Sequence, residues 1–299
     1  MSAVTAARPQ HPALRAPALA RTSTVLLAPG LLILFGIFAL PLLGLGLESL
    51  RQYVPGRVGS AIDAPLTTEN YRELATASFA GVLYETFKLS AAASLAGLLA
   101  AFPLAYCIVR RFSPRQRAAC IGLLVMLVLL SMLVRTYALE LAFGSVGIAR
   151  PLLLALGISP TSRGYIEVLV GAGLLHAIVP ICTLTLLGTI QNIDPRLCDA
   201  AQSLGAPAWK AHLGITVPLA LPGLVSAFLI AMTFAISAFV IPMVLGKGRV
   251  LFLSNTIYTR FSDVANYPSG AAVSIAMLVI SLLVLSLVSL VQRRKGARS

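Results

Sequence analysis

The sequence predicts an all-α membrane protein with six transmembrane helices and both termini in the cytoplasm. Of its 299 residues, 58% are hydrophobic and only 11% are charged, whereas soluble domains average about 25% charged residues. Six apolar runs are long enough to cross a bilayer, which requires about 20 residues. Basic residues gather at the ends of alternate runs, a pattern that is typical of cytoplasmic loops.

The apolar runs divide the chain into a first helix and a five-helix core. The first run is too long for the core of a signal peptide and no convincing cleavage site follows it, so we expect a retained anchor. Prolines inside three runs are tolerated because neighbouring helices satisfy the freed carbonyls. These prolines are Pro103, Pro180 and Pro242. The predicted spans are Thr24–Leu47, Leu89–Val109, Ala118–Val134, Val168–Ile190, Leu219–Leu245 and Gly270–Val291.

The distribution of charge sets the predicted orientation. Thirteen of the 23 Lys and Arg residues fall in the two tails and in the loops after the second and fourth spans, with only Asp194 and Asp199 opposing them. This side is therefore predicted to be cytoplasmic. The predicted segments are a cytoplasmic tail (1–23), a first transmembrane helix (24–50), an external loop (51–84), the core (85–291) and a second cytoplasmic tail (292–299).

One more apolar run, Ala138–Ile158, carries Glu140, Arg150 and Pro151. A charge at the bilayer centre costs about 2.5–3.5 kcal/mol on insertion scales. A seventh span would also place the C-terminal basic cluster outside. We therefore predict an external interfacial helix or a re-entrant segment.

The loop between the fourth and fifth spans (194–218) has the signals of two short helices joined by a tight turn. Asp194 can cap a helix over Pro195–Leu204, because proline is favoured at the first helical position. Gly205 suits a left-handed cap at the end of that helix. A second helix is predicted over Pro207–Val217, with Pro218 limiting it. On the first helix, one face carries Leu197, Ala201 and Leu204.

The same loop resembles the "EAA" motif of the membrane subunits of ABC importers. Aspartate replaces the usual glutamate, and Val217 replaces the usual leucine before the proline; both changes are mild. The longer stretch "IDPRLCDAAQSLGAPAWKAHLGITVPLALPG" resembles the family on both sides of the motif. The residues that match the motif's spacing are Asp199, Ala200, Ala201, Gly205, Ile215 and Pro218.

Three further stretches are similar to the spermidine/putrescine-type permeases of that family. Related permeases for iron, phosphonates or amino-acid-like solutes share much of this pattern, so these solutes stay open as alternatives. The stretches are "ETFKLSAAASLAGLLAAFPLAYCIVR" (Glu85–Arg110), "MLVRTYALELAFGSVGIARPLLLALGI" (Met132–Ile158) and "AFVIPMVLG" (Ala238–Gly246).

The resemblance implies a type I ABC importer fold in a bacterial inner membrane and a non-catalytic subunit. The loop would be a coupling helix that docks on a cytoplasmic ATPase dimer, with Leu204 among its contacts. The chain has no G-x-x-x-x-G-K-[ST] segment, so ATP and Mg²⁺ are expected on the partner and no cofactor on this chain. A second permease subunit and an external solute-binding protein are the other implied partners.

Polar residues inside the spans are candidates for the solute path. Serine and threonine in membrane helices more often bond a backbone carbonyl or a neighbouring helix than a solute. The candidates inside spans are His176, Thr183, Thr185, Thr189, Thr233 and Ser237, and near the external end Glu140 and Asp263 could attract a cation. Two plainer alternatives are ion pairs, Glu140 with Arg135 and Asp199 with Arg196.

Other function classes fit the sequence less well. The net charge of +13 is spread over short clusters, without the continuous basic face of a nucleic-acid-binding protein. The four cysteines have no metal-binding spacing and the three histidines are scattered, so neither a disulfide nor a metal site is expected. A secondary carrier would favour inverted repeats and paired acids at mid-membrane, and a membrane scaffold would leave the loop's spacing unexplained.

Overall fold

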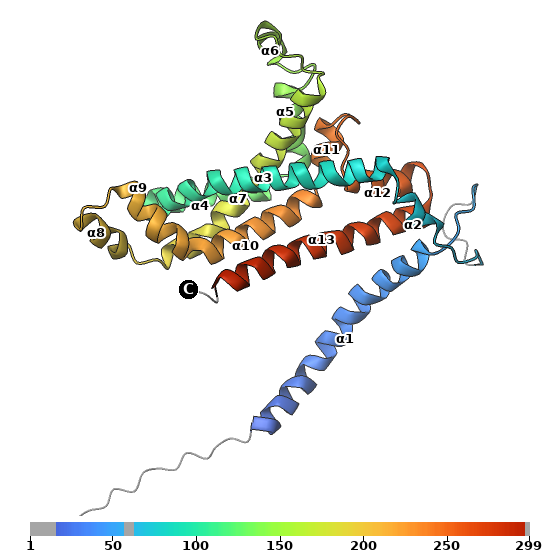
Figure 1. Cartoon of the computed structure of the whole chain (residues 1–299), viewed down its shortest axis with the longest axis horizontal. Helices are drawn as coiled ribbons and strands as arrows, with labels where there is room; N and C mark the ends of the chain where they lie inside the picture. Colours follow the sequence, from blue (N-terminus) through green and yellow to red (C-terminus); the bar gives the residue numbers. More distant parts are fainter. Residues whose placement is uncertain (1–15, 57–62, 297–299) are drawn as a thin grey trace, which may run out of the picture.

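A computed structural model of the chain describes residues 16–56 and 63–296, and these form a bundle of long helices (Figure 1). The expected tails therefore lie partly outside the described residues. The long helices are α1 (Ala16–Ser49), α3 (Ala77–Arg110), α4 (Pro114–Leu129), α7 (Arg163–Gln191), α10 (Val217–Ile236) and α13 (Tyr267–Gly296). The shorter elements are α2 (Glu69–Glu73), α5 (Met132–Phe143), α6 (Arg150–Ala155), α8 (Arg196–Ser203), α9 (Ala208–Ala211), α11 (Val240–Leu245) and α12 (Leu253–Tyr258), with π-helical turns η1 (His212–Thr216) and η2 (Thr259–Asp263).

The centre of the bundle is formed by α3, α7 and α10, which pack on one another. Small side chains line their seams, which allows the backbones to approach closely. A side chain at Gly223 of α10 would place its Cβ 2.1 Å from Thr189 Oγ1 on α7, so only glycine fits there. The centre of the core is sealed, since Leu174, Ile178 and Leu186 of α7 are completely buried.

Helix α1 stands apart from this centre; it contacts α13 toward the end that leads to α2 and diverges from it toward its own N-terminus (Figure 1). Its apolar segment Leu27–Ser49 is long enough to span a membrane, and none of its most apolar window is buried inside the chain. Its large side chains are exposed, as Leu32 (71%) and Ile37 (74%) illustrate. Such a surface suits lipid or another apolar helix.

Within the described residues, five helices are long and apolar enough to cross a membrane, or six if the bent pair α4 and α5 forms one span. The prediction of a continuous third span over Ala118–Val134 was wrong. The helix stops at Leu129, Leu130 and Ser131 are extended, and α5 leaves at an angle of 91°. The predicted start of the second span was also late, because α3 begins at Ala77 with Thr76 as its cap.

The apolar segment Ala138–Ile158 does not form a single helix. It contains the end of α5, a turn, and the short helix α6. Both helices project away from the bundle (Figure 1). The interruption falls after Phe143, where a Cβ at Gly144 would lie 2.2 Å from the carboxylate of Glu140.

The fifth span ends earlier than predicted. Helix α10 stops at Ile236, and the segment that was expected to continue it to Leu245 forms the separate helix α11. Side chains from α12 satisfy the carbonyls that this break exposes: Ser254 Oγ donates to Ala238 O at 2.6 Å, and Asn255 Nδ2 donates to Phe239 O at 3.3 Å. Such compensation makes non-helical backbone tolerable among apolar helices.

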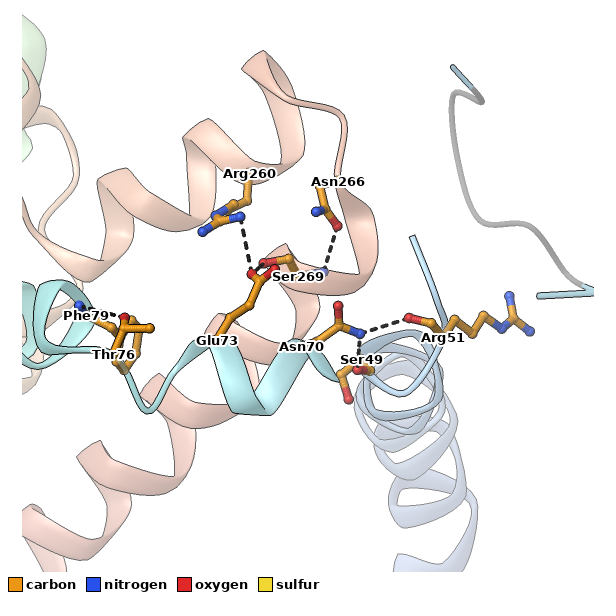
Figure 2. Close-up of polar contacts among 9 residues, drawn as sticks. All are labelled: Ser49, Arg51, Asn70, Glu73, Thr76, Phe79, Arg260, Asn266 and Ser269. Carbon is orange, nitrogen blue, oxygen red and sulfur yellow. Dashed lines mark hydrogen bonds and ion pairs between the residues drawn. The ribbon is translucent and has the colours of Figure 1, made fainter. Parts of the chain in front are cut away.

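A polar junction joins α1, α2 and α13 at the end of the bundle opposite α8 (Figures 1 and 2). Asn70 Nδ2 donates to the carbonyls of Ser49 (2.9 Å) and Arg51 (2.8 Å). The carboxylate of Glu73 accepts from Ser269 Oγ at 3.3 Å and from Arg260 Nη1 at 3.5 Å. The loops after the first and fifth spans therefore meet at one end of the bundle. The sequence predicts that both loops lie on the same, external side of the membrane.

Candidate functional site

The loop between α7 and α10 begins with the short helix α8, whose two ends are capped as predicted. Asp194 Oδ1 accepts a hydrogen bond of 3.0 Å from the backbone N–H of Arg196. Gly205 has a φ of +91°, in the left-handed region. Its N–H donates to Gln202 O, and the next N–H donates to Ala201 O, which is the Schellman pattern of helix termination.

Helix α8 presents most of its surface to the outside. Leu204 is 90% exposed and Leu197 is 46% exposed. Asp199 and Ala200 are exposed, whereas Ala201 is half-buried. The alternative ion pair between Asp199 and Arg196 does not occur among the described residues, so the Asp199 carboxylate stays available to a partner.

The second helix of the loop does not stop at Pro218, which corrects the prediction. Helices α9, η1 and α10 form one continuous helical segment, Ala208–Ile236. The turn His212–Thr216 is π-helical, with the N–H of Val217 donating to His212 O. This wider turn relieves the clash between a proline ring and the carbonyl four residues earlier. Ile215 is half-buried and Pro218 is exposed on this segment.

A polar cavity of about 300 Å³ lies between α8, η1 and the end of α3. Cys198 on α8 and Thr216 on η1 are both buried there, with their Sγ and Oγ1 atoms 3.2 Å apart. His212 Nδ1 lies 3.2 Å from the same hydroxyl and 3.7 Å from the sulfur. The ring of Tyr106 packs edge-on against His212, with 4.9 Å between the ring centroids.

Arg110, at the end of α3, holds the other side of the loop. Its Nη2 donates to Ile190 O at 2.8 Å and also to Ile193 O. Ile190 lies in the last turn of α7, where its carbonyl also accepts the backbone N–H of Ile193 at 3.4 Å, and Ile193 follows the helix. Arg111 lines the cavity beside α8. The loops after the second and fourth spans therefore lie at the same end of the bundle.

Most hydroxyl groups proposed for the solute path are bonded to their own helices. Thr183, Thr185 and Thr233 each donate to the carbonyl four residues earlier, at 2.7–2.9 Å. Thr183 is completely buried and reaches no surface of the bundle. Thr233 and Ser237 lie exposed on α10, and Ser237 Oγ donates to Thr233 O at 3.0 Å.

The ionisable candidates separate in space. Glu140 forms an ion pair with Lys247, with 2.5 Å between Oε1 and Nζ. This finding rules out the alternative pair of Glu140 with Arg135, whose Nε and Nη1 atoms are buried without a partner in the described structure. His176 lines an apolar pocket between α3, α4 and α7. Asp263 lies exposed in η2.

A charge network that was not predicted from the sequence joins the N-terminal parts of α3 and α7. Arg163 pairs with Glu85 and, at 3.3 Å, with Glu167, which also pairs with Lys88 at 3.3 Å. The contacts of Arg110, Cys198 and His212 were not predicted either. The i, i+4 spacing of His212 and Thr216 could have predicted their contact, since residues at this spacing share a helix face.

Comparisons with known proteins agree with this geometry. Residues 93–296 match the family described as "Binding-protein-dependent transport system inner membrane component". The spermidine/putrescine transport system permease protein PotB of Haemophilus influenzae is 30% identical over 223 residues, 74% of this chain and 78% of PotB. PotB of Escherichia coli is 27% identical over the same share of this chain and 81% of its own.

The fold also resembles a solved structure. A chain of a bacterial alginate ABC transporter, crystallised with an alginate-bound periplasmic protein, superimposes with a TM-score of 0.70 at 21% sequence identity. The superposition covers 91% of this chain and 96% of that chain. Because the family match spans more than half of the sequence, this chain belongs to the inner-membrane components of binding-protein-dependent transport systems, and it is a multi-pass permease subunit of an ABC importer.

Proposed function

We propose that this permease forms part of the translocation path for a polyamine such as putrescine or spermidine. The observation that carries the choice of solute is the similarity to PotB, which extends over 74% of the chain. Thr233 and Ser237 are the candidate path residues that stay exposed on α10. Iron, phosphonate and amino-acid-like solutes are the alternatives within the family.

The ion pairs of the described residues bear on how a cationic solute would be handled. Glu85, Glu140 and Glu167 each pair with a lysine or arginine. Their charges are therefore largely balanced within the chain. In this proposal the external solute-binding protein binds the polyamine tightly. The path through the membrane binds it weakly enough to release it.

The exposed face of α8 supports a role as the contact with a cytoplasmic ATPase dimer. Leu197 and Leu204 offer an apolar surface, Asp199 offers a carboxylate without an ion-pair partner among the described residues, and Gly205 ends the helix sharply. ATP and Mg²⁺ would bind to that partner. A second permease subunit completes the path, and the end of the bundle that carries α8 is cytoplasmic, together with both termini.

Uptake of radiolabelled putrescine and spermidine tests this function directly. The strain expresses the whole operon and lacks its own polyamine importers, and a strain without this chain is the control. We expect ATP-dependent uptake that unlabelled polyamine competes away. Uptake of an iron chelate, a phosphonate or an amino acid without competition by polyamines would reject the proposed solute.

A further inference from the structure

Helix α8 packs on α9 and η1 and buries one side chain there. Cys198 is its only buried residue, at 7% exposure, while its other side chains are exposed or half-buried. A force applied to the outer face of α8 therefore reaches the spans through its contacts with α9 and η1, in which Cys198 is the buried side chain of α8, or through the backbone at the ends of the helix. The contacts of Cys198 determine which span receives that force.

Both polar neighbours of the Cys198 sulfur belong to η1. Thr216 Oγ1 lies at 3.2 Å and His212 Nδ1 at 3.7 Å, and the two neighbours lie 3.2 Å from each other. Thr216 is 3% exposed and Cys198 is 7% exposed, so bulk solvent has little access to the contact between these two side chains. Buried hydrogen-bonded networks of this kind fix one relative position of the elements that carry them.

The turn η1 continues directly into a membrane span. It is part of the helical segment Ala208–Ile236, which α10 completes. Its π-helical bonding is a feature that is often found at functional sites. The edge-on contact of Tyr106 with His212 supports the same turn from α3. A displacement of α8 that Cys198 transmits to η1 is therefore passed along the helix to α10.

We propose that Cys198, His212 and Thr216 form the joint through which movement of α8 drives α10 during transport. The inference rests on the proposed function, in which α8 is the contact with the ATPase. The three side chains are positioning residues: they touch neither solute nor nucleotide, and they make α8 and η1 move as one rigid body. Arg110 holds the opposite end of the loop at the carbonyls of Ile190 and Ile193.

Replacements by the apolar side chain of valine, which matches threonine in shape and is slightly larger than cysteine, test the joint. Cys198→Val and Thr216→Val in the assembled importer should lower the amount of putrescine taken up per ATP hydrolysed about fivefold or more, at normal membrane abundance. Cys198→Ser and Thr216→Ser keep a hydroxyl and should restore most of this ratio. Cys120→Val, which changes a half-buried thiol of α4 that lines a different pocket, should leave the ratio unchanged.

A cross-link tests the rigid-body movement without relying on loss of function. In Thr216→Cys, the new thiol would face Cys198, and mild oxidation should join them. Since the joint keeps the two helices together, the oxidised importer should retain binding-protein-stimulated ATP hydrolysis and uptake. The same substitution combined with Cys198→Ser is the control that cannot form this bond.

The outcomes separate this inference from the proposed function. If the wild-type complex imports putrescine and the valine variants take up as much putrescine per ATP hydrolysed, the proposed joint is wrong and the proposed function stands. Loss of transport on oxidation would mean that α8 moves relative to η1, which also contradicts the joint. If the wild-type complex does not take up putrescine, the proposed solute is rejected. The joint can still be tested in that case: stimulated ATP hydrolysis in the oxidised complex would support it, and its loss would contradict it.

Discussion

Arg110 Nη2 donates a hydrogen bond of 2.8 Å to the carbonyl of Ile190, and so the last residue of α3 caps the end of α7. The same nitrogen also donates to Ile193 O, just before the loop that carries α8. Hydrogen bonds from a charged donor contribute about 1.5–3 kcal/mol, more than neutral ones. The arginine that ends the second span therefore does more than set the orientation of the chain in the membrane.

Removing this cap should loosen the loop. Arg110→Ala is expected to lower the free energy of unfolding of the purified complex by about 1.5–3 kcal/mol and to reduce uptake. Arg110→Lys should recover part of both, because an ammonium can reach one carbonyl but lacks the planar fork. Thermal unfolding in detergent measures the first effect. The control is Arg115→Ala, an exposed arginine of α4; equal effects of both alanine variants would contradict the cap.

The ion pair between Glu140 and Lys247 should hold α5 against the turn after α11. Its side chains are 15% and 35% exposed, so water screens it in part. A double-mutant cycle with Glu140→Gln and Lys247→Met should give a coupling energy of about 1 kcal/mol in thermal unfolding. The pair Glu69–Arg72 is the matched control, since it is 3.9 Å long with both side chains well exposed. Its coupling should be near zero, and equal couplings in the two cycles would refute the structural role.

The orientation can be tested by labelling with a membrane-impermeant thiol reagent. Asp63→Cys and Thr161→Cys should react from outside in sealed cells, above the background of the four native cysteines. Arg115→Cys should react only after the membrane is permeabilised. All three positions are exposed. Labelling of Arg115→Cys in sealed cells would reverse the assigned sides.

The sequence predicted the helices wherever one long apolar run decides the structure, as in α3, α7 and α13. It failed where tertiary contacts end a helix. The break after Ile236 depends on Ser254 and Asn255, which lie on α12 and bond the freed carbonyls. The break at Leu130 and Ser131 likewise has no signal in the local hydrophobic pattern, because both flanking segments are apolar.

The candidate site shows the same division. The caps of α8 at Asp194 and Gly205 were predictable because they are local and depend on one residue each. The contact of Cys198 with Thr216 was not, since it joins residues 18 positions apart across a turn whose angle the sequence does not give. The passage of the helix through Pro218 depends on a π-helical turn that hydrophobic periodicity does not reveal.

The sharp end of α8 should be required for coupling. Gly205 has a φ of +91° and open space around its Cβ position, so a substitution there acts through backbone strain, of roughly 1 kcal/mol or more for any side chain. Gly205→Val should therefore tilt α8, abolish uptake and uncouple ATP hydrolysis from the binding protein, at near-normal membrane abundance. Asp199→Ala should do the same more weakly, because it removes an exposed charge and leaves the turn intact, whereas Asp199→Glu should be tolerated.

The measurement is ATP hydrolysis by the reconstituted complex with and without loaded binding protein. Gly188→Val places the same change on α7 at an exposed glycine with open space and ordinary backbone, and it should keep stimulation. If Gly205→Val keeps full stimulation and full uptake, α8 is only a connector between two spans.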